Sequence, residues 1–233
     1  MKRNLTLGLA VMWLSVFALS AVPPRANAQS AGLVSSIFAK MERNRRDLRT
    51  LRAGISMEKY NAQIKDSDKQ SGVVIYMPAT GRNSFVRVDW QRPQQETLAV
   101  ADGKYTLFRP RLKLAYVGDA NSNRNKVSGV LGFGLNVSRA QLTSAYETPQ
   151  DVYDETLWGG ARAWHMKLVP KGGASYSYAE IWVDNGGMPV QTKVVERYGD
   201  TTTVRLTDVQ SNTNIQKNEF KLDLGSDVKR VRG

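Results

Sequence analysis

Apolar residues recur at every second position along most of the chain after Gly54, in short segments separated by turn residues. Successive side chains of a β-strand point to opposite faces, so each segment predicts a strand that buries one face. The apolar positions of these segments are Val86, Val88 and Trp90; Leu112, Leu114 and Tyr116; Trp164, Met166 and Leu168; Ile181 and Val183; Val190 and Val194; and Val204 and Leu206. We therefore expect a mainly β chain, an antiparallel sheet curled into a half-open barrel around one apolar interior.

Two short turn sequences support local strand pairing. Leu98 and Val100 lead into Asp102-Gly103, and an apolar segment resumes at Tyr105. Asp184-Asn185-Gly186-Gly187 separates two further alternating segments. Asp-Gly and Asn-Gly pairs tolerate positive φ, so each sequence predicts a tight hairpin.

The predicted sheet needs a cover on its apolar face. Residues 33–48 carry apolar side chains at the spacing of one amphipathic helix, with basic residues on its other faces. One helix covers less area than a sheet of this many strands presents, so a second cover or a ligand is implied. The glycine-interrupted apolar segment Val127–Leu135 is the candidate, as a lid or as an ordinary packing loop, and Ser138 predicts the N-cap of a short helix through Ala145.

The first residues resemble a secretory leader. Lys2 and Arg3 precede an apolar run from Leu5 to Val22, and Ala26-Asn27-Ala28 offers small residues to a signal peptidase. We expect cleavage after Ala28, leaving residues 29–233 as a single domain exported to the periplasm. An uncleaved membrane anchor is the alternative, which Pro23-Pro24 directly after the apolar run disfavours.

The net charge of the chain limits the kinds of molecule that it is expected to bind. The chain carries a formal net charge of +12, and the leader holds three of its basic residues and no acidic one. Export argues against nucleic acid, whereas an anionic membrane surface or an acidic protein surface stays available for transient contact. We expect a monomer.

The chain lacks the usual catalytic and metal-binding residues. It has no cysteine and one histidine, so thiol catalysis, disulfides and multi-histidine metal sites are excluded, and no cofactor is expected. His165 alternates with the apolar positions beside it and is expected to face solvent. Asp151, Asp154 and Glu155 lack a calcium-loop pattern. These features predict a binding protein and not an enzyme.

Two parts of the chain resemble the periplasmic outer-membrane lipoprotein carrier family, LolA. The first runs from Pro93 through the Asp102-Gly103 turn to Phe108-Arg109-Pro110, and the second from residue 168 through Ile181-Trp182-Val183-Asp184 to residue 222. Leu131-Gly132-Phe133-Gly134 before a short helix is similar to the apolar lid of many relatives.

The resemblance implies a half-open barrel with a helical lid, whose cavity receives lipoprotein acyl chains. It also implies an inner-membrane ABC transporter as donor and, in some lineages, an outer-membrane receptor. Family members hold the lid with an arginine before a proline, just after a strand that begins with glycine. The segment Gly72–Pro78 begins similarly here, but no Arg-Pro pair directly follows it, and Arg82 or Arg87 is the nearest match. We expect these residues to form the cavity and lid: Val86, Val88, Trp90, Leu98, Leu107, Leu131, Phe133, Leu135, Trp164, Met166, Ile181, Val183, Val194 and Leu206.

The sequence leaves two other functions open. One is a carrier or sensor of free lipid or glycolipid on the same scaffold, because a curled apolar sheet does not specify its ligand. The other is an envelope protein that binds a protein partner or an anionic membrane, with its interior filled by its own side chains.

If Val127–Leu135 is a lid, Phe133→Glu should abolish cargo loading. A charged side chain in an apolar cavity loses its hydration without a partner, so both lid packing and cargo binding suffer. The melting temperature should shift by only a few degrees. Loading and thermal unfolding of the purified variant measure the two effects, and an equal loss of both would refute a lid role.

Overall fold

The computed structural model describes residues 25–78, 84–120 and 137–233. Its elements are one long and one short α-helix, two 3₁₀ helices and twelve strands. In chain order they are α1 (Arg25–Asp47), β1 (Leu51–Asn61), β2 (Asp66–Met77), β3 (Phe85–Arg92), β4 (Glu96–Ala101), β5 (Lys104–Arg109), η1 (Pro110–Leu112), β6 (Leu114–Asp119), α3 (Arg139–Ala145), β7 (Gln150–Thr156), β8 (Arg162–Leu168), β9 (Tyr176–Asp184), β10 (Pro189–Glu196), β11 (Thr201–Ser211), η2 (Lys217–Phe220) and β12 (Lys229–Arg232).

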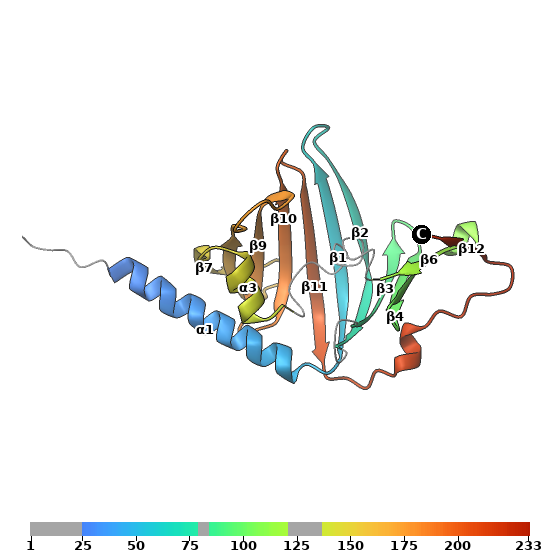
Figure 1. Cartoon of the computed structure of the whole chain (residues 1–233), viewed down its shortest axis with the longest axis horizontal. Helices are drawn as coiled ribbons and strands as arrows, with labels where there is room; N and C mark the ends of the chain where they lie inside the picture. The colour runs from blue at the N-terminus through green and yellow to red at the C-terminus, as the bar shows by residue number, and fades with distance from the viewer. Residues whose placement is uncertain (1–24, 79–83, 121–136) are drawn as a thin grey trace, which may run out of the picture.

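The strands form one curved open sheet (Figure 1). Its order is β12-β6-β5-β4-β3-β2-β1-β11-β10-β9-β8-β7, and the pairs are antiparallel except that β12 runs parallel to β6. The three longest strands, β2, β1 and β11, are neighbours near the middle of this order, and β1 pairs with β2 over its full length. The mainly β, open-barrel class predicted from the alternation is therefore confirmed.

Both predicted hairpin turns are present. Asp102 and Gly103 have φ values of 52° and 76° between β4 and β5. In the turn between β9 and β10, the Gly187 amide donates to the Asp184 carbonyl at 3.0 Å, and the Asp184 side chain accepts from the Met188 amide at 2.8 Å. The short turns fix the register of the strands they join.

Helix α1 packs against one end of the sheet. Val34, Ile37, Phe38 and Met41 are buried in one cluster with apolar side chains of β8 and β9. Figure 1 shows α1 and α3 together at this end and β12 at the other. Of the helices that the structure describes, none has the length and apolar character needed to cross a bilayer.

Helix α3 begins where the sequence predicted. The Ser138 hydroxyl accepts from the Gln141 amide at 3.2 Å, and the Gln141 side chain accepts from the Ser138 amide at 2.8 Å. This reciprocal capping box satisfies two amides at the start of the helix. The candidate lid Val127–Leu135 lies outside the described residues.

The structure corrects one strand boundary. The alternation predicted a strand through Leu112, but Leu112 lies in η1 with 64% of its surface exposed. Pro110 starts this turn, and Lys113 ends it in the left-handed region at φ 46°. The strand therefore begins at Leu114.

Residues 212–228, named here the C-terminal strap, follow the last strand of the antiparallel part of the sheet. Ile215 and Phe220 of the strap are buried with Ile75, and Phe85 packs against this cluster. The strap leads into β12, which pairs with β6 at the edge of the sheet. The sequence pattern did not predict this parallel strand.

We expect Gly187→Ala to lower the free energy of unfolding by at least about 3 kcal/mol. Gly187 has φ 91°, and an added Cβ would overlap the Lys40 carbonyl of α1 and lie 2.8 Å from the Met41 nitrogen. Urea unfolding measures the loss. Gly159→Ala is the control, since φ there is 90° and no atom lies within 4 Å, and it should lose about 1–2 kcal/mol. Equal losses would show that the helix contact does not constrain Gly187.

Candidate functional site

One face of the sheet, named here the inner face, carries the apolar side chains and packs against α1. Residues paired across strands point to the same side, so the pairing register defines this face. Its rows are Met166, Ile181, Thr192, Val204, Met57 and Gln70; Leu206, Ile55, Gly72, Trp90, Glu96 and Arg109; Val74, Val88, Leu98, Leu107 and Tyr116; and Tyr76, Val86, Val100, Tyr105 and Gly118.

The register places every predicted lining residue that the structure describes on the inner face. The pairing register also places three further residues on this face: Trp164, Val183 and Val194. Leu107, Trp164 and Val194 are half-buried, and the other predicted positions are buried. Leu131, Phe133, Leu135 and Arg82 lie outside the described residues.

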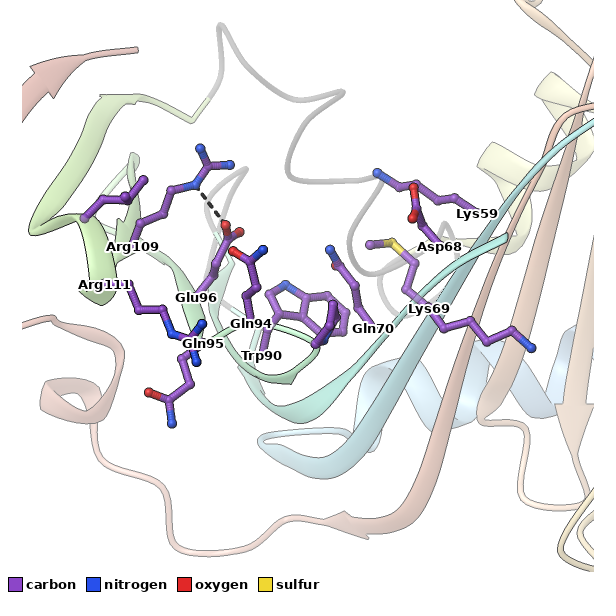
Figure 2. A pocket seen from close by; sticks show the side chains of 13 residues that line it. Lys59, Asp68, Lys69, Gln70, Trp90, Gln94, Gln95, Glu96, Arg109 and Arg111 are labelled. Atoms are coloured by element: carbon purple, nitrogen blue, oxygen red, sulfur yellow. Dashed lines mark ion pairs between the residues drawn. The ribbon is translucent and has the colours of Figure 1, made fainter. Parts of the chain in front are cut away.

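A cavity of about 420 Å³, named here the mouth cavity, adjoins the inner face. Met57 and Trp90, both buried residues of that face, contribute to its wall. Figure 2 shows Arg109 and Glu96 on one side, Lys59 and Asp68 on the other, and Gln94, Trp90 and Gln70 between them. The remaining lining residues are Lys69, Pro93, Gln95, Arg111 and Leu112. An apolar surface thus ends in a polar, charged opening.

The mouth cavity has one ion pair across neighbouring strands. Arg109 Nε lies 2.8 Å from Glu96 Oε1, but the contact lacks the alignment of a hydrogen bond. Figure 2 draws this pair as a dashed line. The Arg109 guanidinium also lies 5.7 Å from the Tyr116 ring centre. The register pairs Glu96 with Trp90 and Arg109 with Leu114, so the charges lie on the inner face.

The buried phenol on the inner face stays neutral at ordinary pH. Burial raises the pKa of Tyr76, although its contact with Ser84, at 3.3 Å between the hydroxyl oxygens, and the positive charge of Arg45 oppose that shift. A neutral hydroxyl costs less to keep in an apolar environment than an ion does. The inner face away from the mouth cavity is therefore compatible with hydrocarbon.

Glu42 joins the two described helices. Its carboxylate accepts from Arg45 at 2.6 Å and from the Arg139 backbone amide, in the first turn of α3, at 3.2 Å. The Arg45 hydrogen bond, followed by the Arg139 amide, lowers the pKa of Glu42 below its ordinary value of 4.5. A second cavity of about 270 Å³ lies beside this contact, and Val34, Phe38, Leu142 and Leu168 are among its lining residues.

Arg87, one of the two candidate latches, lies on the opposite face of the sheet, named here the outer face. Its guanidinium bonds Asp89 at 2.9 Å and donates to the Glu219 carbonyl at 3.0 Å. Glu219 also pairs with Arg52 at 3.1 Å. Arg87 therefore contacts the C-terminal strap on the outer face, whereas the predicted lid was expected to cover the inner face.

The expectation that His165 faces solvent is wrong. His165 alternates with the inner-face residues as predicted, but only 3% of its surface is exposed. The ring lies 4.5 Å from that of Tyr153 and 4.8 Å from that of Trp182, and Nδ1–H donates to the Asp151 carbonyl at 2.8 Å. Side chains of β7 and β9 cover the outer face here, which alternation within β8 does not reveal.

The sequence did not predict the mouth cavity. Its lining residues come from β1, β2, β3, the β3–β4 connection, β4, β5 and η1, and most are polar. The Arg109-Pro110-Arg111 sequence, after an alternating strand, is the local signal that could have indicated it. Only the sheet register brings these arginines to the same opening as Lys59 and Gln70.

The family model for outer membrane lipoprotein carrier protein LolA matches residues 79–223, more than half of the chain. The chain belongs to the LolA family. This family comprises carrier and binding proteins, and its fold is suited to holding a lipid or an acylated ligand. No curated protein matches the sequence.

Solved structures show the same LolA-like fold at low identity. MucB has a TM-score of 0.56 at 13% identity, with 84% of this chain covered. An uncharacterized conserved protein from Thermus thermophilus has a TM-score of 0.51 at 13% identity, covering 86% of this chain and 99% of that one. The Pseudomonas aeruginosa MucA/MucB complex has 0.50 at 13%, covering 85% of this chain and 63% of that one. The chain spans 64% of the length of MucB.

In this LolA-family chain, Glu42→Gln should loosen α3 and destabilise the fold near neutral pH. Because the pKa of Glu42 is lowered on folding, its contribution is complete above the ordinary value of 4.5 and is lost as pH falls through the folded value. Urea unfolding and α3 amide exchange should thus differ from wild type at pH 7 and converge at an acidic pH well below 4.5.

Glu147→Gln is the matched control, because Glu147 is exposed and its side chain makes no hydrogen bond or ion pair with the described residues. Its stability should equal wild type at both pH values. A Glu42→Gln variant with unchanged α3 protection at pH 7 would contradict the helix-joining role.

Proposed function

We propose that residues 29–233 form a periplasmic carrier that binds the acyl chains of lipoproteins and ferries them from the inner to the outer membrane. The observation that carries this proposal is the continuous apolar inner face, which ends in an open cavity on a LolA-family fold. Valines and aromatic side chains line its rows, as hydrocarbon binding requires.

A carrier must both hold and release its cargo. Each methylene group moved from water to an apolar surface contributes about 0.8 kcal/mol, so three acyl chains would bind almost irreversibly to an empty cavity. A chain segment that packs on the inner face when cargo is absent would compete with cargo and lower the net affinity. We assign this role to Val127–Leu135, with Phe133 as its main apolar contact.

The carrier role also needs a donor and an acceptor. On this proposal the donor is an inner-membrane ABC transporter and the acceptor an outer-membrane receptor or the membrane itself. The apolar run Leu5–Val22 and the small residues at Ala26–Ala28 support export by a cleaved leader. The basic character of the chain supports transient contact with anionic membrane surfaces.

A second candidate is the binding of a protein partner in the envelope. It is favoured by the similarity to a MucB structure determined with MucA bound. A free lipid or glycolipid would fit the same inner face as an acylated protein.

Native mass spectrometry of the protein isolated from its host periplasm separates these functions. Acylated lipoproteins bound one to one would support the carrier, and peptide identification would name the cargo. Free lipids alone would favour a lipid carrier or sensor. An empty protein that takes up no offered lipopeptide would favour the partner-binding function.

Leu107→Glu should weaken lipopeptide binding at least about tenfold, because it places an unpartnered charge on the inner face. Leu107 is half-buried in β5, and its partners are Leu98 and Tyr116. Thr106→Glu is the control, because Thr106 is also half-buried but points to the outer face beside Ala99 and Val117. Calorimetric titration with a triacylated lipopeptide measures both, and equal weakening would contradict inner-face binding.

A further inference from the structure

The mouth cavity differs chemically from the inner face it adjoins. Four of its lining side chains are cationic, two are anionic and three are primary amides: Lys59, Lys69, Arg109 and Arg111; Asp68 and Glu96; Gln70, Gln94 and Gln95. The lining carries an excess of positive charge. A purely hydrocarbon ligand would make no use of these charged and amide side chains. A ligand with a polar end could bind to them.

Two of these cationic side chains form no ion pair with the described residues. Among the described residues, neither Lys59 nor Arg111 has an acidic partner within 4.0 Å, although Lys59 lies opposite Asp68 in the β1–β2 register. Lys69, by contrast, pairs with Glu58 at 3.4 Å, and the register places this pair toward the outer face. Within the described ranges, Lys59 and Arg111 thus have no ion-pair partner and can meet an anion.

The fourth cation, Arg109, forms an ion pair with Glu96 that leaves part of its hydrogen-bonding capacity unused. Its Nε is buried and makes no hydrogen bond with the described residues, although the carboxylate oxygen lies 2.8 Å away. A misaligned pair keeps its electrostatic attraction but leaves guanidinium donors for another acceptor. An arginine fork suits an anion with two oxygens in one plane, such as a phosphate or a carboxylate.

Neutral donors surround the same space. The side-chain amides of Gln70, Gln94 and Gln95 make no hydrogen bond that the described part of the chain provides, and neither does the indole N–H of Trp90. Figure 2 shows Trp90 between Gln94 and Gln70, with the amides beside its ring. The Trp90 ring itself is buried and faces the apolar rows. One wall therefore offers donors at its rim and an apolar surface behind them.

From this arrangement we propose that the mouth cavity binds the anionic polar end of an amphiphile, a phosphate or a carboxylate, whose hydrocarbon chains lie on the inner face. This inference rests on the proposed acyl-binding function and specifies the ligand class. Lys59 and Arg111 supply charge, Arg109 and the amides supply hydrogen bonds, and Met57 and Trp90 contact the first methylene groups.

The test compares amphiphiles with one tail and different heads. Calorimetric titration with n-dodecyl phosphate and n-dodecyl maltoside, below micellar concentrations, should show the phosphate binding about tenfold tighter to the wild-type protein. This preference should shrink as salt rises, because the cations are exposed. Equal affinities for the two heads would overturn the proposal.

The variant Lys59→Gln with Arg111→Gln should lose that preference while keeping its affinity for the maltoside. Arg43→Gln with Lys229→Gln is the matched control, since both residues are exposed and their side chains make no hydrogen bond or ion pair with the described residues. An equal loss in the control would mean that net charge, and not the mouth cavity, attracts the phosphate, and would overturn the proposal.

Two lipopeptides identify the source of the anion. Each carries the same triacylated cysteine, followed by Asp-Asp in one and Ser-Ser in the other. Tighter binding of the Asp-Asp lipopeptide would support the proposal and indicate that the anion is a carboxylate of a protein cargo. If only dodecyl phosphate binds more tightly than its neutral counterpart, the proposal is also supported, and the anion is a lipid headgroup. Binding of no amphiphile would overturn the acyl-binding function itself, and this inference with it.

Discussion

The hydrophobic face of one curved sheet determines the rest of this structure. Twelve strands present alternate side chains to a common side, and that side is apolar from Met166 in β8 to Tyr105 in β5. Removing such a surface from water is the main favourable term in folding, yet α1 packs on only the β8 and β9 part of it. Among the described elements α1 thus covers only part of this face, and a face of this kind is suited to holding an apolar ligand.

The polar groups lie where they do not interrupt the apolar part of the inner face. Buried side chains of the inner face are apolar or neutral, as with Tyr76, while Lys59, Glu96 and Arg109 gather where the face meets solvent. Charges at an opening remain hydrated and cost little, whereas the same charges behind Val88 would be strongly destabilising. The positions of polar and apolar groups thus follow from solvation.

Much of the fold could be predicted from the sequence because alternation is a local signal. The period of two at Val86–Trp90 and at Trp164–Leu168 identified both the strands and the side chains that share the inner face. The turn at Asp102-Gly103 and the cap at Ser138 were local as well. The burial of His165, the parallel strand β12 and the assembly of the mouth cavity depend on neighbours distant in the chain, so alternation along one strand does not predict them.

The C-terminal strap has a mechanical consequence. Phe220 is fully buried against Ile75 of β2, Glu219 holds Arg87 of β3 and Arg52 of β1, and the strap continues to an edge strand beside β6. Strands at the centre and at the rim of the sheet are thereby joined across the outer face. Flattening the sheet would stretch this connection, so the strap resists changes in the curvature of the sheet and thereby in the shape of the inner face.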